Sequence, residues 1–215
     1  MGCILKGSSG LWSRLSVGAV VLATGHDERL DHPAALLELA GVPLVLRQLI
    51  ALSGAGVDEL AVVLGRRAAE VEPVLQSFPI HVVHDPAPER GPAASLRLGL
   101  ERLSPRLDAV IVSTAALPWI DGQDVTALIG GFKKRGDAAT VVLPRSADGR
   151  AGAALIADAG VRDRWLAEGV DERDLHGTGE AVVRWLDVAH PRLHTVIRGL
   201  EDVEAFARTS GHRLG

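Results

Sequence analysis

Residues 17–29 read Val-Gly-Ala-Val-Val-Leu-Ala-Thr-Gly-His-Asp-Glu-Arg, and residues 36–44 read Leu-Leu-Glu-Leu-Ala-Gly-Val-Pro-Leu. The first stretch joins an apolar run to a glycine turn and a polar loop. The second leads through a Gly-x-Pro-Leu segment into a helical pattern. A glycine at the end of a buried strand lets the backbone approach a phosphate group, whose oxygens the loop amides can then bind. The two stretches predict an α/β fold with an anion-binding loop after its first strand.

The charges of this loop conflict with that prediction. It carries Asp27, Glu28 and Asp31 and contains no lysine. Two unit charges ~4 Å apart interact by ~4 kcal/mol at an effective dielectric constant of ~20. The missing lysine and the added acids are therefore expected to weaken the binding of a nucleoside triphosphate to this loop by several kcal/mol, unless a metal ion intervenes.

The composition bounds the class of protein. The chain has 215 residues, is 47% hydrophobic and carries a net charge of −4. This charge gives no indication that the protein binds nucleic acid. Cys3 is the only cysteine, which excludes a disulfide within the chain and fits a cytoplasmic protein. No apolar run reaches the ~18 residues that span a membrane. We expect a flexible leader over residues 1–16 and a single domain over residues 17–215.

Short apolar runs alternate with helical patterns along the chain, which predicts right-handed βαβ units and a mainly parallel, doubly wound three-layer sheet. The predicted strands are 17–23, 59–64, 80–83, 109–113 and 139–143, followed by weaker signals at 151–157 and 182–188. The predicted helices are 43–53, 66–77, 93–103, 121–132, 161–167 and 201–209, and residues 168–180 are predicted to be a loop with a short helix. Pro73 is expected to kink or shorten the second helix.

Several stretches together resemble the MobA-like nucleotidyltransferases, which include guanylyl- and cytidylyltransferases of the molybdenum cofactor. Residues 22–30, Leu-Ala-Thr-Gly-His-Asp-Glu-Arg-Leu, resemble the family signature Leu-Ala-Ala-Gly-x-Ser-x-Arg-Met-Gly. The resemblance continues through residues 36–44, Asp85-Pro86, residues 91–100 and residues 197–202, and so covers nearly all of 17–208. It implies a GT-A-like fold. It also implies a nucleotide site that includes Leu22, Ala23, Thr24, Gly25, Arg29 and Ser95, with Mg²⁺ as the cofactor of an active member.

The charged positions of the family pattern are replaced in this chain. The family's loop lysine falls on Ala34, and its two metal-binding aspartates fall on Ala116 and Arg198. The Asn of its Asn-Pro motif falls on Asp85, and the His-Pro of its Gly-His-Pro motif falls on residues 153–154, which are both alanine. We therefore predict no catalytic and no metal-binding residue.

Other residues offer alternatives that the sequence leaves open. Asp121 could replace a metal ligand, although an N-cap of the helix that follows it is the favoured interpretation. The three loop acids could bring Mg²⁺ with a nucleotide, and His26 and His32 beside them could hold a transition metal. Arg29 could contact a phosphate or be an exposed loop arginine. Ser95 could contact a base or ribose, or be packed near a helix start.

We favour a homologue that has lost metal-dependent nucleotidyl transfer and acts as a binding or regulatory protein, with a nucleotide, another small molecule or a protein as its partner. The alternative is an active nucleotidyltransferase with a rearranged site, which would transfer a nucleotidyl group to a phosphorylated small molecule or cofactor. A sugar transferase on the same fold is a weaker interpretation, because it would need an Asp-x-Asp motif after a strand, and the sequence has none.

Overall fold

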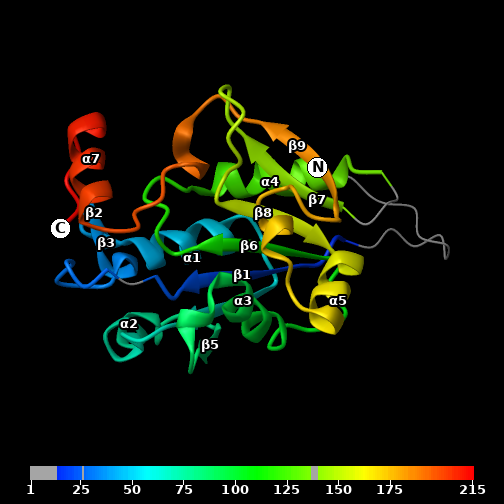
Figure 1. Cartoon of the computed structure of the whole chain (residues 1–215), viewed down its shortest axis with the longest axis horizontal. Coiled ribbons are helices and arrows are strands. Elements are labelled where there is room, and N and C mark those ends of the chain that lie inside the picture. Colours follow the sequence, from blue (N-terminus) through cyan, green and yellow to red (C-terminus); the bar gives the residue numbers. More distant parts are fainter. Residues whose placement is uncertain (1–13, 26, 137–139) are drawn as a thin grey trace.

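A central sheet forms the middle layer of the molecule (Figure 1). The computed structural model describes residues 14–25, 27–136 and 140–215. Within these residues, seven strands lie in the order β5-β4-β1-β6-β8-β7-β9. Their bounds are β1 Val17–Ala23, β4 Glu59–Leu64, β5 His81–His84, β6 Ala109–Thr114, β7 Thr140–Arg145, β8 Ala154–Asp158 and β9 Val182–Asp187.

The predicted α/β class is confirmed, and β8 is the one reversed strand of this sheet. It pairs antiparallel with both β6 and β7, whereas the other ladders are parallel. A short hairpin, in which Arg145 bridges to Ala151, joins β7 to β8. Parallel neighbours need a crossover of a dozen or more residues, and this connection is too short for one.

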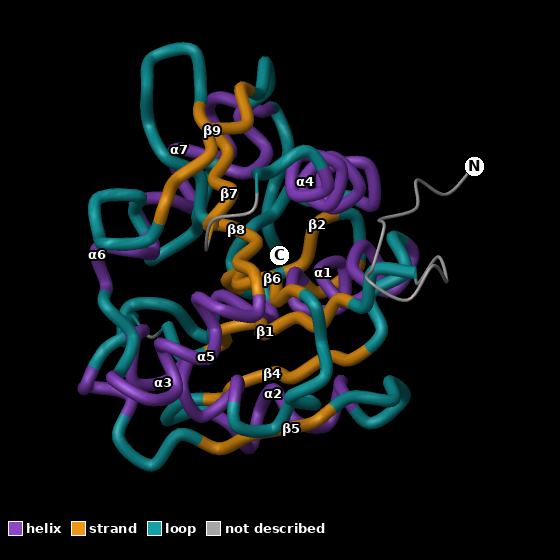
Figure 2. The backbone as a smooth tube through the Cα atoms, turned by 90° about the vertical axis from the view of Figure 1, so that its right-hand side faces the viewer, coloured by secondary structure: helices purple, strands orange, loops and turns teal. Residues whose placement is uncertain are grey.

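Helices cover both faces of the sheet, as Figure 2 shows with α3 and α5 on one side and α1 and α4 on the other. The helices are α1 Leu44–Gly54, α2 Ala68–Leu75, α3 Pro92–Leu100, α4 Gly122–Lys133, α5 Ala159–Glu168, α6 Glu172–Leu175 and α7 Leu200–Ser210. Short 3-10 turns lie at Ala34–Leu36, Pro88–Arg90 and Pro191–Leu193. Helix α2, which contains Pro73, is shorter than predicted at both ends.

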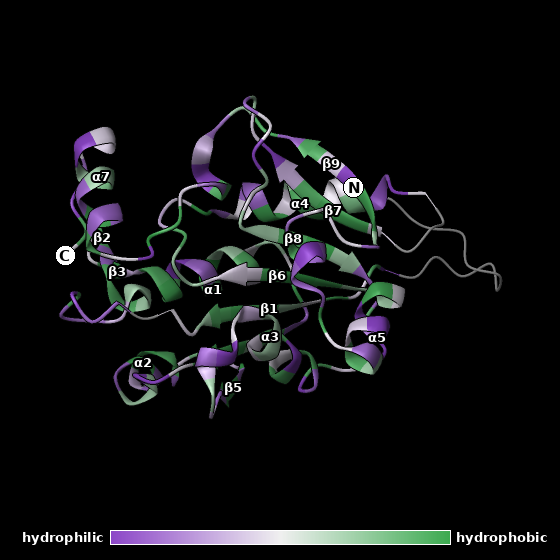
Figure 3. Cartoon of the chain, viewed as in Figure 1, coloured by the Kyte–Doolittle hydropathy of each residue, from purple (hydrophilic) through white to green (hydrophobic). Residues whose placement is uncertain are grey.

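Two apolar layers hold the helices on the sheet. One joins α1, α2 and α4 to one face of the strands, and the other joins α3 and α5, including the fully buried Trp165, to the opposite face. Helix α3 lies so close that a side chain at Gly99 would meet Val20 of β1. Figure 3 shows the hydrophobic colours along the central strands and more hydrophilic ones on α7. No helix built from the described residues is both long and apolar enough to cross a bilayer.

A small hairpin beside α1 was not predicted from the sequence. Strands β2 (Glu38–Leu39) and β3 (Val42–Pro43) pair antiparallel across a two-residue turn. Both turn residues, Ala40 and Gly41, have positive φ values, of 55° and 76°. Tight hairpin turns favour this left-handed backbone, so the Gly41 of the Gly-x-Pro-Leu segment serves this turn.

The start of the described chain is held against the sheet. The amide of Ser16 donates to Asp108 at 2.7 Å, and Arg14 forms an ion pair with Asp58 at 3.0 Å. Both carboxylates belong to the edge of the sheet at which the parallel strands begin. The rest of the expected leader lies outside the described residues.

Candidate functional site

A pocket of about 400 Å³ lies beyond the carboxyl ends of β1 and β6. Ligands of open α/β sheets bind at this edge. Most of its walls are apolar, and they come from β1, β6, β8, the start of α3, the end of α6 and the segment before α7. The lining residues include Leu22, Thr24, Gly25, Pro92, Thr114, Ala153, Ala154, Leu175, His176, Val196 and Arg198.

A second pocket, of about 250 Å³, lies beside the first. It reaches towards the loop after β1 and is lined in part by Ala34, Ala115, Ala116 and Ile197. The two pockets share Leu22, Gly25, Thr114, Val196 and Arg198 in their walls. The shared walls make them two parts of one candidate site.

Four of the six residues predicted to bind a nucleotide lie in these walls. Leu22 and Gly25 line both pockets, Thr24 lines the larger one and Ala23 the smaller one. An added Cβ at Gly25 would find no other atom within 4 Å, so the backbone faces open space there. The end of β1 therefore supplies part of the pocket wall, as the glycine turn predicts.

Arg29 lies outside both linings and is held by two carboxylates. Its guanidinium donates to both oxygens of Asp27, at 3.0 and 2.8 Å, and to Glu201 of α7 at 2.9 Å. The hydrogen bonds from the Arg29 side chain and amide lower the pKa of Asp27 to about 2. Asp27 in turn lies against Gly199, at the start of α7. These contacts hold the loop against α7. That Arg29 contacts a phosphate of a ligand stays a prediction.

Ser95 also lies outside both linings. Its hydroxyl is fully buried and donates to Asp85 Oδ2 at 2.6 Å. The other oxygen of Asp85 accepts the amide of Ala87 at 2.8 Å. This pair joins α3 to the loop after β5. A contact of Ser95 with a base or ribose stays a prediction.

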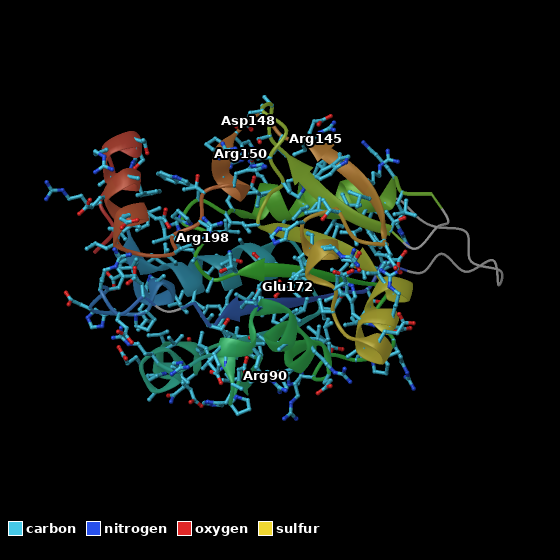
Figure 4. The ribbon with its side chains drawn as sticks, viewed as in Figure 1. Arg90, Arg145, Asp148, Arg150, Glu172 and Arg198 are labelled. Atoms are coloured by element: carbon cyan, nitrogen blue, oxygen red, sulfur yellow. The ribbon has the colours of Figure 1, made fainter. Side chains whose placement is uncertain are left out.

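Arg198 enters the site at the point where the two pockets meet. The amide of Ile197 donates to the carbonyl of Ala116 at 2.9 Å, and the amide of Arg198 donates to Asp202 Oδ2 at 2.7 Å. These bonds fix the backbone, and Figure 4 shows Arg198 beside the end of β6. Among the described residues, the Arg198 guanidinium has no hydrogen-bond or ion-pair partner.

An ion-pair network holds the segment that leads to Arg198. Arg192 contacts Asp121 at 2.8 Å and Asp124 at 3.2 Å, and both acids belong to the start of α4. Burial raises the pKa of Asp124, although the Asp121 amide donates to its carboxylate. Asp121 accepts the amides of Gln123 and Asp124, so the prediction of a helix N-cap is confirmed. The Asp121 carboxylate is therefore occupied by the helix cap and by its ion pair with Arg192.

One wall of the larger pocket comes from Leu175 at the end of α6 and from His176 after it, and we call this wall the lid. Asp174 of α6 is buried and accepts hydrogen bonds from Arg164, Trp165 and the amide of Ala181, each within 3.0 Å. These bonds tie the lid to α5 and to the start of β9. Neither lid residue was predicted from the sequence, because residues 168–180 show neither helical nor strand periodicity.

The side chains of the site do not fit a magnesium ion. Mg²⁺ prefers carboxylate and phosphate oxygens, and no described lining residue of either pocket is Asp or Glu. The described residues include no cluster of three or more His, Cys, Asp or Glu side chains that could hold a metal ion. His32 lies 3.6 Å from Glu70, away from the lining, and His26 lies outside the described residues.

A family model described as the MobA-like NTP transferase domain matches residues 19–207. The bifunctional protein GlmU of Sorangium cellulosum is 28% identical over 133 residues, which are 58% of this chain and 28% of GlmU. This chain therefore matches less than a third of the length of that curated relative.

Solved structures that share the fold include Mth528 and Rv0371c. Mth528, a nucleotidyl transferase from Methanothermobacter, is 25% identical with a TM-score of 0.70, over 90% of this chain and 99% of that one. Rv0371c of Mycobacterium tuberculosis H37Rv in complex with manganese is 23% identical with a TM-score of 0.71, over 92% of this chain and 100% of that one. At 23% identity, the similarity to Rv0371c shows only that the two proteins share a fold.

Proposed function

Since the chain belongs to the family of MobA-like NTP transferase domains, we propose that it binds a nucleotide or a related phosphorylated small molecule without carrying out metal-dependent nucleotidyl transfer. The observation that carries the proposal is the charge of the pocket walls. Arg198 lines both pockets, and no described lining residue is a carboxylate. Such walls suit an anion and lack the oxygen ligands that hold Mg²⁺ against a triphosphate.

The loop after β1 supports the same proposal. Its arginine, Arg29, is held by Asp27 and Glu201, so the loop presents acids rather than a free cation. Glu28 and Asp31 are exposed, and neither lines a pocket. The described part of this loop therefore offers a triphosphate no unpaired arginine.

An active nucleotidyltransferase with a rearranged site is the second candidate. The family match over residues 19–207 favours it, as does the likeness to Mth528, a nucleotidyl transferase. In that case a carboxylate would have to move into the pocket when substrate binds, with Mg²⁺ as the cofactor.

Pyrophosphate release separates the two candidates. The protein is incubated with ATP, GTP, CTP or UTP and either Mg²⁺ or Mn²⁺, with a deproteinised cell extract as a pool of acceptors. We expect no protein-dependent pyrophosphate, together with measurable nucleotide binding in the presence of EDTA. Metal-dependent pyrophosphate release that requires the protein would overturn the proposal.

Three further proposals concern the whole chain. One domain over residues 17–215 is supported by the continuous central sheet. A cytoplasmic location is supported by the single cysteine, Cys3. A regulatory role with a protein partner would follow from binding without transfer, and co-purification of the tagged chain would test it.

A further inference from the structure

We infer that the site selects a nucleoside monophosphate over the corresponding triphosphate, with the Arg198 guanidinium as its phosphate contact. The inference rests on the proposed function and adds to it the class of ligand and the residue that selects it. Arg198 is the one described residue in the walls of either pocket that carries a permanent charge.

The position of Arg198 suits an anion contact. Two backbone hydrogen bonds fix residues 197 and 198 against Ala116 and Asp202, so the side chain starts from a held backbone. The guanidinium has no partner among the described residues, so no internal ion pair competes with a ligand. Arginine offers a planar fork of donors that matches two phosphate oxygens at once.

The larger pocket provides the place for the rest of the ligand. Leu22 and Pro92 line it on the side of β1 and α3, and Leu175 lines it from the lid. Thr24, Thr114 and His176 add polar atoms. A volume of about 400 Å³ lies in the range of ~300–1,000 Å³ that is usual for small-molecule sites. Apolar walls with a few polar groups suit a base and its ribose.

The charge around Arg198 determines how many phosphate groups a bound ligand can carry. A phosphate monoester carries a charge of about −1.5 to −2 near neutral pH, which one guanidinium offsets in large part. Each added phosphate brings further negative charge, and the Asp27 carboxylate lies against Gly199, the residue that follows Arg198. Like charges repel each other at short distance. A longer phosphate chain is therefore expected to weaken binding in the absence of metal.

Equilibrium titration in EDTA tests this selection with AMP, GMP, CMP and UMP, each compared with its triphosphate. We expect at least one monophosphate to bind about tenfold more tightly than its triphosphate, which corresponds to ~1.4 kcal/mol. Arg198→Ala should weaken that monophosphate about tenfold or more, and Arg198→Lys should weaken it less. Arg102→Ala is the matched control. Arg102 is exposed and follows α3 at the opposite edge of the sheet, so this variant should bind like the parent protein.

Three results would overturn the inference: triphosphates binding more tightly than monophosphates, Arg198→Ala binding like the parent protein, or no monophosphate binding at all. The proposed function fails separately, in the pyrophosphate assay, because that assay measures transfer and not the preference between ligands. Unfolding curves of each variant exclude a loss of fold as the cause of weaker binding.

Discussion

The amide of Ile197 donates a hydrogen bond of 2.9 Å to the carbonyl oxygen of Ala116. This bond joins the segment before α7 to the end of β6 and brings Arg198 and Ala116 into the wall of one pocket. The family resemblance assigns metal-binding aspartates to these two positions. In this chain Arg198 places a guanidinium and Ala116 places a methyl group at these positions. The positive charge of the site therefore comes from an arginine side chain.

Gly25→Ala should block the site without unfolding the protein. Gly25 lines both pockets, its φ is not positive, and an added Cβ finds no atom within 4 Å. The free energy of unfolding should be unchanged or raised by up to about 1 kcal/mol, because alanine restricts the unfolded chain. Ligand affinity should fall about tenfold or more as the methyl group occupies ligand space.

The control for this variant is Gly130→Ala in α4, where an added Cβ also meets nothing within 4 Å and no pocket wall is involved. Unfolding by urea and titration with ligand measure the two effects independently. Equal affinity of Gly25→Ala and the parent protein would place the ligand away from the end of β1.

Ser95→Ala should lower stability rather than ligand affinity. The substitution removes the 2.6 Å bond to Asp85 and leaves a buried carboxylate oxygen without its partner. Loss of one partner of a buried polar pair costs about 1–3 kcal/mol. Urea unfolding measures the loss, with the exposed Ser53→Ala in α1 as the control. Weaker ligand binding by a folded Ser95→Ala protein would instead support the role of Ser95 as a ligand contact.

The contact between Asp27 and Arg29 should make stability depend on pH in the acid range. Arg29 lowers the pKa of Asp27 from 3.8 to about 2 in the folded protein. The contact therefore contributes stability above pH 3.8, and this contribution is lost as the pH falls from 3.8 towards 2.

Asp27→Asn should make the loss of stability over this interval shallower. Glu28→Gln, in the same exposed loop, should leave the slope unchanged, because no described residue forms an ion pair with Glu28. Urea unfolding at a series of pH values measures both slopes. Identical slopes for Asp27→Asn and the parent protein would mean that the contact does not form in solution.

Rebuilding the two carboxylates should create a dependence on Mg²⁺. Ala116→Asp combined with Arg198→Asp places two acids in the walls of one pocket of about 250 Å³. An ion at 100 times its dissociation constant stabilises a folded protein by ~2.7 kcal/mol, so Mg²⁺ should raise the Tm of this variant. The parent protein and the neutral pair Ala116→Asn with Arg198→Asn should not respond. A Tm of the parent protein that rises with Mg²⁺ would contradict our view of the site.

The fold could be predicted from the sequence to within a few residues for most elements. The bounds of β1 and β4 are those predicted, because buried parallel strands are continuous apolar runs bounded by turns. The hairpin at residues 38–43 was missed because its turn depends on the left-handed backbone of Ala40, which alanine rarely adopts.

The site was predictable where it follows from strand ends and not where it depends on tertiary contacts. Leu22, Thr24 and Gly25 line the pocket because they end β1. The lid residues Leu175 and His176 reach it through the buried Asp174, whose partners come from α5 and the start of β9. Arg29 and Ser95 are held by partners that local sequence patterns do not reveal, Glu201 and Asp85.

The dependence of ligand affinity on metal decides whether the site binds phosphate through Arg198 or through a metal ion. The nucleoside monophosphate that binds in EDTA is titrated again, by calorimetry, in the presence of saturating Mg²⁺. Binding through Arg198 predicts dissociation constants that agree within about twofold under the two conditions. Affinity that appears only with Mg²⁺, or increases more than about tenfold on its addition, would show that the site works through a metal ion and would contradict the account.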